Sequence, residues 1–394
     1  MRKITLCVFL LLGMYPLLAQ DSTQMNMDAV YNRPFLGVGK SPVSLGGYLE
    51  ANTNYFGSDG ITEGFSFELP RLTIFMAATI NHRIKFLSEI ELEEGGNELS
   101  IEFAAMDVSF HPMLNLRGGV LMNPIGAFNQ NHDGPQWEFI NRPIVSTTLV
   151  PSTWSNVGMG IYGKTARDNL VFSYEAYLTN GFDNTIVENT ENRTWLASSK
   201  ANSERFEESY NGEPLATLKV AIKHLALGEI GLSWMGGVYN KFENDGLVFD
   251  KKRRVDLIAV DWRMTLPTNT KLVGEYVWAT IDVPSTYSQQ FGDQQKGGFL
   301  DIVHPILSKS MLGWANATLN LAARLEYTDY NVGTFNETGG NIFDHRYAIV
   351  PSISFRPSTE TVFRFNYRMD WERDILGNPA IKTVGYQFGF STYF

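Results

Sequence analysis

The clearest pattern in this chain lies near its C-terminal end, where large apolar and polar side chains alternate residue by residue. From Thr361 to Trp371 one face is apolar, and the other carries polar or charged groups that include Arg364 and Arg368. A period of two is that of a β-strand, whose successive side chains point to opposite sides. Similar ladders lie over 313–328 and 381–394. Each is about ten or more residues long, as a tilted membrane-crossing strand must be. The pattern predicts strands between two different solvents.

The same alternation predicts sixteen strands along the chain. We expect them near residues 43–53, 67–80, 83–93, 98–110, 114–122, 156–165, 169–179, 214–224, 228–239, 254–266, 269–283, 298–308, 313–328, 344–355, 359–371 and 381–394. Most connections are short at one rim and long at the other, which is typical of outer-membrane barrels and has no cause in a soluble sandwich. The fold class predicted is all-β, a transmembrane antiparallel β-barrel of about 16 strands, with 14 or 18 also possible.

The connections also predict an orientation. An even number of strands puts both ends of the barrel on the short-turn rim, which would face the periplasm. Loops 180–213, 284–297 and 329–343 would then be extracellular. The first connection, Asn54–Ser66, is expected to be long, and Glu94–Asn97 to be a short exception.

The N-terminal residues predict export. A basic start, a short apolar run and a small residue at its end make residues 1–19 a signal peptide, with cleavage expected after Ala19. The single cysteine, Cys7, lies in that segment. Residues 20–42 are expected to form a polar periplasmic leader and 43–394 the barrel. The predicted location is the outer membrane of a Gram-negative bacterium.

Composition supports a barrel over a soluble sandwich. Aromatic residues make up 13% of the chain, it has 35 glycines, and only 19% of its residues are charged. Aromatic girdles and twisted, glycine-containing strands fit membrane barrels. The formal charge is −10, and removing Arg2 and Lys3 changes it to −12. This acidity argues against nucleic acid as a partner.

Signals for catalysis are weak. The six histidines show no metal-ligand spacing, and no metalloprotease, paired-cysteine or serine-hydrolase motif occurs. We therefore predict no enzyme activity, no cofactor and no metal. One alternative stays open: a barrel-embedded hydrolase that uses His132, which is followed by Asp133.

Charged residues on the polar faces predict the lining of the lumen. The expected pore-lining residues are Arg83, Lys85, Glu89, Glu91, Glu93, Arg324, Glu326, Arg364 and Arg368. They would form an arginine wall opposite a carboxylate wall, and such a field orients dipolar solutes. The alternative is that these charges pair with one another and merely fill a polar interior.

The connection 123–155 is long enough to have a function of its own. Its apolar residues would be costly in water, so we expect it to fold into the barrel and narrow the pore. The expected constriction residues are Asn129, Asn131, His132, Asp133, Trp137, Arg142 and Trp154. The alternative is an ordered lid across the outer mouth.

The last strand ends on an aromatic residue. Tyr386, Phe388, Phe390 and Phe394 fit the aromatic C-terminal signal that outer-membrane assembly machinery reads. Phe394 can equally be the last lipid-facing residue of the strand.

Residues 118–163 carry a more specific signature. They include Gly-Val-Leu-Met-Asn-Pro-Ile-Gly at 119–126, Asn-Arg-Pro-Ile-Val-Ser-Thr-Thr at 141–148 and Pro-Ser-Thr-Trp-Ser-Asn-Val-Gly at 151–158. This stretch resembles the outer-membrane porins related to the phosphate-selective porin O and P group, in particular the versions found in Bacteroidota. The resemblance implies a 16-stranded barrel, often a homotrimer, in which arginines and lysines select phosphate. This chain departs from that pattern because glutamates interleave with its inward basic residues, so phosphate selectivity is not carried over.

These observations predict a porin that gives passive diffusion of small hydrophilic solutes or ions. The alternative is a non-conducting barrel that acts as a structural or assembly partner in a membrane-protein complex. The expected partners are outer-membrane lipid, the assembly machinery, and small solutes or ions.

Overall fold

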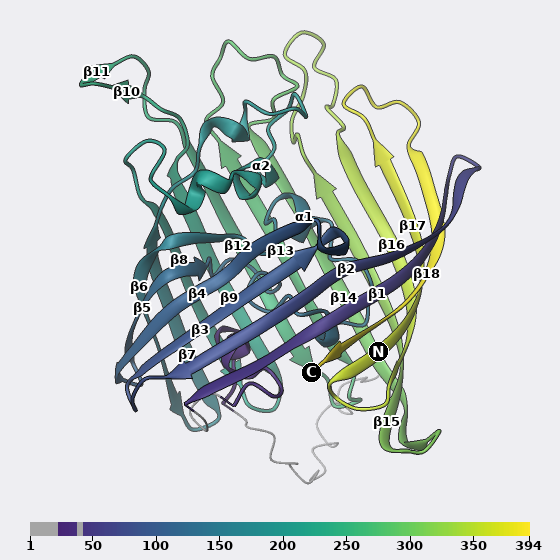
Figure 1. Ribbon diagram of the computed structural model, residues 1–394. Helices are drawn as coiled ribbons and strands as arrows, with labels where there is room; N and C mark the ends of the chain where they lie inside the picture. The colour runs from purple at the N-terminus through teal and green to yellow at the C-terminus, as the bar shows by residue number, and fades with distance from the viewer. Residues whose placement is uncertain (1–22, 38–41) are drawn as a thin grey trace, which may run out of the picture.

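A computed structural model describes residues 23–37 and 42–394 of the chain. Sixteen strands close into one antiparallel barrel in which every strand pairs with its neighbour along the chain and β1 pairs with β18 (Figure 1). The barrel strands are β1 (Val43–Ser58), β2 (Ile61–Thr79), β3 (Ile84–Glu93), β4 (Glu98–His111), β5 (Leu114–Met122), β6 (Ser155–Arg167), β7 (Leu170–Thr179), β8 (Leu215–His224), β9 (Gly228–Val238), β12 (Arg254–Thr265), β13 (Lys271–Ile281), β14 (Gln294–Met311), β15 (Trp314–Asp329), β16 (His345–Arg356), β17 (Thr361–Arg373) and β18 (Ile381–Tyr393). The predicted fold class and strand number are confirmed.

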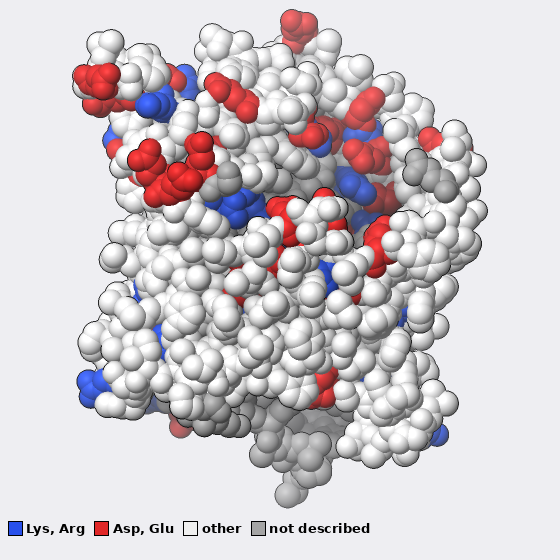
Figure 2. All heavy atoms as spheres, viewed as in Figure 1, with Lys and Arg blue, Asp and Glu red and all other residues white. Residues whose placement is uncertain are grey.

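The strands form because their side chains alternate as the sequence predicts. On β17, Arg364 is 1% exposed whereas Phe365 is 47% exposed. Phe388 on β18 and Leu321 on β15 also face outward, at 49% and 52% exposure. The wall therefore turns apolar groups outward and polar groups inward, the reverse of a soluble protein. Figure 2 shows charged side chains of both signs in the opening at the top and few of them on the side wall.

The first connection differs from the expected long loop over Asn54–Ser66. β1 and β2 continue through those residues and meet at a two-residue turn, Asp59–Gly60. Both turn residues have positive φ, 48° and 87°, as an Asp-Gly hairpin turn requires. The polar residues of this stretch resemble a loop in composition, but they alternate as a strand does. The result is a hairpin that rises beyond β3 at the right of Figure 1.

The two rims are unequal. We call the rim with the 112–113, 168–169 and 312–313 connections the short-turn end, and the opposite rim the long-loop end. The long-loop end carries the short helices α2 (Ala197–Ala201), η4 (Asn184–Ile186) and η5 (Ser203–Phe206), the hairpin of β10 (Glu243–Asn244) and β11 (Leu247–Val248), and the short 3-10 turn η2 (Glu94–Gly96). None of the helices among the described residues is both long and apolar enough to cross a membrane.

The interior of the barrel is filled by two segments. The connection 123–154, which contains η3 (Gly134–Gln136) and α1 (Val145–Thr148), packs Ile125, Trp137 and Trp154 against wall residues of β9, β12 and β13. At the short-turn end, η1 (Asn26–Tyr31) and Leu36 lie against the inner wall.

Residues 20–42 are predicted as a polar periplasmic leader, and the structure places η1 of this segment inside the barrel at the short-turn end. Met25, Met27 and Val30 are buried, and the backbone N–H of Asn26 donates to Glu229 of β9 at 2.9 Å. Lys164 of β6 forms an ion pair with Asp28 at 2.7 Å. The apolar side chains of this polar segment are the reason for its burial. The predicted signal peptide, 1–19, lies outside the described residues.

Candidate functional site

The connection 123–154, which we call the inner loop, is bound to the wall through its backbone. Ala127 and Phe128 N–H groups both donate to Glu275 of β13, at 2.6 and 3.1 Å. The Ile140 N–H donates to Asn366 of β17 at 2.7 Å, and the Ile144 N–H donates to Glu326 of β15 at 2.6 Å. Buried peptide groups need such partners, and charged acceptors give the stronger bonds. Two wall carboxylates and one wall amide thus fix the path of the loop.

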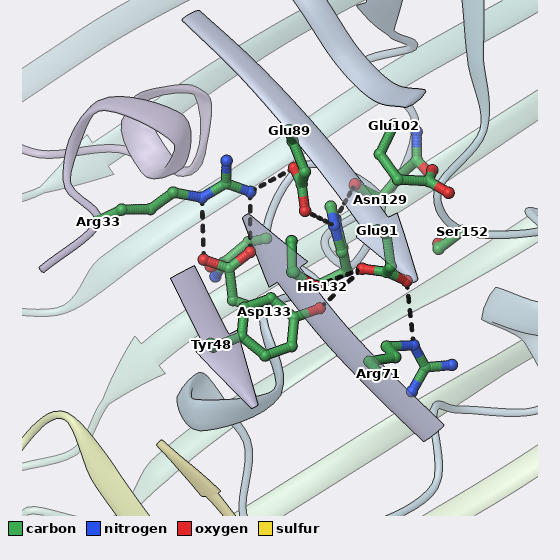
Figure 3. A network of polar contacts seen from close by, with 12 residues as sticks. Arg33, Tyr48, Arg71, Glu89, Glu91, Glu102, Asn129, His132, Asp133 and Ser152 are labelled. Carbon is green, nitrogen blue, oxygen red and sulfur yellow. Dashed lines mark hydrogen bonds and ion pairs between the residues drawn. The ribbon is translucent and has the colours of Figure 1, made fainter. Parts of the chain in front are cut away.

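The tip of the inner loop meets the N-terminal segment at an ion-pair cluster (Figure 3). The Arg33 guanidinium donates to both oxygens of Asp133, at 3.0 and 2.9 Å, and to Glu89 at 2.6 Å. The same guanidinium lies 3.7 Å from the centre of the Phe75 ring. We call Arg33, Glu89, His132 and Asp133 the tip cluster. It joins the leader, β3 and the inner loop.

His132 is bonded through both of its ring nitrogens. Nε2 lies 3.1 Å from Glu89 Oε1, and Nδ1 lies 2.9 Å from the carbonyl oxygen of Asn129. Burial lowers the pKa of His132, but the charge and hydrogen bond of Glu89 outweigh burial and raise that pKa above 6.5. Two acceptors suit an imidazolium, which donates from both nitrogens. With a side chain that is 0% exposed, His132 has neither the access nor the free nitrogen of a hydrolytic base.

A second group of charges lies beside the tip cluster. Arg71 of β2 contacts Glu50 at 3.0 Å, Glu91 at 3.2 Å and Glu93 at 3.1 Å. Arg142 of the inner loop contacts Glu91 at 3.3 Å and donates to the Ser152 carbonyl at 2.6 Å. These contacts tie the loop to the β1–β3 side of the wall.

The predicted arginine wall is paired with acidic groups. Arg324 binds both oxygens of Asp301, at 2.6 and 2.7 Å. Arg368 contacts Glu326 at 2.9 Å. Arg364 contacts Glu50 at 3.0 Å and donates to the Phe139 carbonyl at 2.9 Å. The acidic partners of these arginines lie on β14, β15 and β1, and none of the three pairs includes the β3 glutamates of the predicted carboxylate wall.

The other predicted residues are placed as follows. Arg83 lies exposed in the turn before β3, because the strand begins at Ile84, and Lys85 lies 5.8 Å from the Tyr31 ring centre. Asn129 bonds within the inner loop, to Asn123 and Trp154. Asn131 accepts from the Trp137 indole through its carbonyl at 2.8 Å. Trp154 is fully buried, with its ring 5.7 Å from that of Phe182.

The four aromatic residues of the predicted assembly signal lie at the barrel seam. Tyr386, Phe388 and Phe394 are exposed, at 38%, 49% and 51%. Phe390 is half-buried against Phe363, with the ring centres 6.0 Å apart.

Sequence reasoning missed several inward charges. Glu50, Arg71 and Glu102 were not identified as lumen residues, although all three are buried or half-buried among the charges of β1–β4. Arg117, also missed, binds both oxygens of Asp107 at 2.8 Å and the Tyr31 hydroxyl at 3.0 Å. The alternating pattern could have identified Glu50 and Arg117 as inward-facing, because each is a charged residue that alternates with non-polar residues along its strand. Arg33 had no such signal because the leader has no periodicity.

Two cavities lie beside the inner loop. The smaller, about 10 Å³, lies between the loop and β1, β2 and β17, and it is lined by Glu50, Arg71, Arg364 and loop residues. That volume holds about one water molecule. The larger, about 500 Å³, opens at the long-loop end and is lined by Arg71, Glu93, Arg142, Lys200 and Arg205 among others.

Two groups of side chains that could ligate a metal lie close together. Glu89, His132 and Asp133 form the first, and Glu91, Glu93 and Glu102 the second. In the first group Arg33 already occupies the position between the carboxylates. The sequence predicted no metal ligands, because each group is completed only by a residue from another segment: the inner loop joins β3 in the first group, and Glu102 of β4 joins β3 in the second.

A closed 16-stranded antiparallel barrel with a long loop inside it is the fold of the outer-membrane porins. The chain is similar in structure to OmpF of Salmonella typhi in complex with daunomycin (TM-score 0.55, 11% identity, 90% of this chain and 98% of that one). It is also similar to an anion-selective porin from Comamonas acidovorans (TM-score 0.52, 12% identity, 89% and 99%). A third similar structure is the trimer form of OmpT, an outer membrane protein of Vibrio cholerae (TM-score 0.52, 10% identity, 90% and 100%).

In sequence, the chain matches an uncharacterized protein of Aquifex aeolicus, at 36% identity over 165 residues. The match covers 38% of this chain and 36% of the other, so the chain spans about a third of the length of the curated relative. No protein-family model matches the chain.

Proposed function

We propose that this chain is an outer-membrane porin through which small hydrophilic solutes or ions diffuse past a narrow constriction. The observation that carries this proposal is the inner loop, which lies within a closed barrel of 16 strands and is bound to the wall by Glu275, Glu326 and Asn366. A barrel of this size leaves room for an aqueous channel, and an internal loop sets its cross-section.

The outward apolar belt supports the location in a membrane. Leu232, Ile258 and Phe365 are 51%, 47% and 47% exposed on three different strands, and such a surface is stable only against lipid. The resemblance of residues 118–163 to the porin O and P group agrees with this role and favours a homotrimer. The same proposal implies that the outer-membrane assembly machinery recognises the aromatic C-terminal strand.

The charges of the lumen favour small polar solutes without a strong preference for anions. Arg324, Arg364 and Arg368 each lie within 3.0 Å of a carboxylate oxygen. A paired arginine attracts a passing anion less than a free one does, because the two fields largely cancel beyond the pair.

A second candidate function is the non-conducting structural or assembly partner. The observation that favours it is the cavity of only about 10 Å³ between the inner loop and β1, β2 and β17. With the interior filled by the inner loop and the N-terminal segment, which meet where Arg33 binds Asp133 at 2.9 Å, ions would pass only when one of these segments moves.

Single-channel recording in planar bilayers tests the proposal. The wild type should give steady conductance steps, and removal of residues 130–136 at the loop tip should enlarge them. Removal of the exposed β10–β11 hairpin is the matched control and should leave the steps unchanged. If neither the wild type nor the tip deletion conducts although both are folded barrels, the porin proposal is wrong and the structural role stands.

A further inference from the structure

Glu102 occupies an unusual position in the wall. The pairing of β3 with β4 shifts by one residue between Glu89 and Ile90, so that Glu102 has no partner in the ladder. A bulge of this kind turns two consecutive side chains toward the same face. Glu102 and Phe103 are accordingly both buried, at 0% and 1% exposure. The bulge thus adds a carboxylate to the inner face of β4, beside Glu91 of β3 (Figure 3).

The three carboxylates of this region converge. One oxygen atom each of Glu91, Glu93 and Glu102 lies within 4.8 Å of the other two. Like charges at this separation repel strongly unless a cation lies among them.

Glu102 lacks the partner that a buried carboxylate needs. Neither of its side-chain oxygens accepts a hydrogen bond. Lys200 Nζ approaches one of them at 3.9 Å, which is beyond hydrogen-bonding distance. An ionised carboxylate buried without hydrogen bonds or a bound cation is strongly unfavourable.

In the tip cluster, by comparison, an arginine is hydrogen-bonded directly to the buried carboxylates. There the Arg33 guanidinium bonds to Glu89 and Asp133 at 2.6 and 2.9 Å. Of Glu91, Glu93 and Glu102, the first two have arginine partners: Arg71 contacts both, and Arg142 contacts Glu91. Neither arginine forms an ion pair with Glu102, whose nearest ion-pair partner among the described residues is Lys200 at 3.9 Å, without a hydrogen bond to either oxygen.

We propose that Glu91, Glu93 and Glu102 bind a divalent cation of the size of Ca²⁺. The ligand atoms are all carboxylate oxygens, which hard cations prefer. The three oxygens lie within 4.8 Å of one another, so one ion can contact all of them. Ca²⁺ accepts oxygen ligands at about 2.3 to 2.6 Å in flexible geometry, whereas Mg²⁺ requires about 2.0 to 2.1 Å in a near-ideal octahedron, which an irregular cluster of three carboxylates suits less well. The cavity of about 500 Å³ that Glu93 lines gives the ion access from the long-loop end and room for water ligands.

Calorimetric titration of the full-length barrel with CaCl₂, after treatment with a chelator, tests the site. We expect one saturable binding event, with an affinity in the range of about 10⁻⁵ to 10⁻³ M. Glu102→Gln keeps the size of the side chain and removes one ligand charge. It should weaken binding by at least about tenfold.

Glu98→Gln is the matched control, because Glu98 lines the same cavity but is not a member of the group. It should bind Ca²⁺ nearly as the wild type does. Ca²⁺ should also raise the unfolding temperature of the wild type and of Glu98→Gln, but not of Glu102→Gln, because a ligand stabilises only the state that binds it. A folded wild type that takes up no Ca²⁺, or a Glu102→Gln variant that binds it equally well, would overturn the proposal. Equal loss in Glu98→Gln would also overturn it, since a diffuse charge effect would then suffice.

Discussion

At the scale of single residues, the inner face of this barrel is built of charges that satisfy one another. The sequence left open whether Arg324, Arg364 and Arg368 would line open water or pair. The structure pairs all three, with Asp301, Glu50 and Glu326. Sequence alone cannot decide this, because Glu50 lies 314 residues from Arg364 and the two meet only once the barrel closes.

Phe365 tests the assignment of the two faces. Its ring is 47% exposed on the outer face of β17, between the buried Arg364 and Asn366. Phe365→Arg should lower the free energy of unfolding in lipid by about 2 to 4 kcal/mol, because it puts a cation against lipid. Phe365→Leu should cost less than about 1.5 kcal/mol. Equal effects of the two substitutions, measured by denaturant titration in bilayers, would mean that this face does not meet lipid.

His132 should make the stability of the inner loop depend on pH. Its pKa in the folded protein lies above the value of about 6.5 that it has when unfolded. The charged groups that act on it are Glu89 and Glu91 from β3, Glu102 from β4, and Asp133 and Arg142 from the loop. Arg33 of the leader pairs with Glu89 and Asp133 beside it. The stabilisation is therefore fully present below about pH 6.5, and it is lost as the pH rises through the higher, folded pKa.

The comparison of wild type with His132→Gln measures this effect. At pH 5.5 the substitution should cost about 1.5 to 3 kcal/mol, the range for a hydrogen bond to a charged group. The difference should shrink at higher pH. Hydrogen exchange of the loop amides, followed in both proteins against pH, reports it. A difference that grows with pH would show that His132 is neutral in the folded state.

At the scale of elements, the strands were predictable and the interior segments were less so. Strand boundaries follow from alternation, and those of β5 and β15 lie within a residue or so of their predicted positions. The sequence predicts a long loop where the structure has the hairpin turn at Asp59–Gly60, because the residues around the turn are polar in composition. The entry of residues 23–37 into the barrel has no periodic signal, since η1 is held by individual contacts such as Arg33 with Glu89.

The orientation of the barrel in the membrane can be tested with epitope tags. Epitope tags at positions 190 and 335 lie in the connections after β7 and β15, at the long-loop end. They should be labelled on intact cells if that end faces outward. A tag at 267, in the turn between β12 and β13, should be labelled only after the outer membrane is permeabilised. Labelling of the 267 tag on intact cells would reverse the orientation.

At the scale of the whole molecule, the fold could be predicted from the sequence, whereas the candidate site could be predicted only in part. The inner loop drew attention through its length and its buried-type residues, and its tip residues His132 and Asp133 do lie among wall charges. Arg33, Arg71 and Glu102 complete that region, but they come from three separate segments. These segments become neighbours through the order of the strands, the path of the leader and a β-bulge. The alternation of polar and apolar residues contains no information about any of these three features.

The seam between β1 and β18 sets the order in which such a molecule can assemble. Gln387 bonds to Asn54 across 333 residues of chain, so this pairing has the highest contact order among the strand pairs. The loop-closure entropy of so long a segment must be overcome before the seam gains any hydrogen bonds. Closure is therefore expected as the slow, late step of folding. The inner loop contacts β17 through Arg364, which also bonds to Glu50 of β1, so the closure that joins β1 to β18 also brings these three segments together.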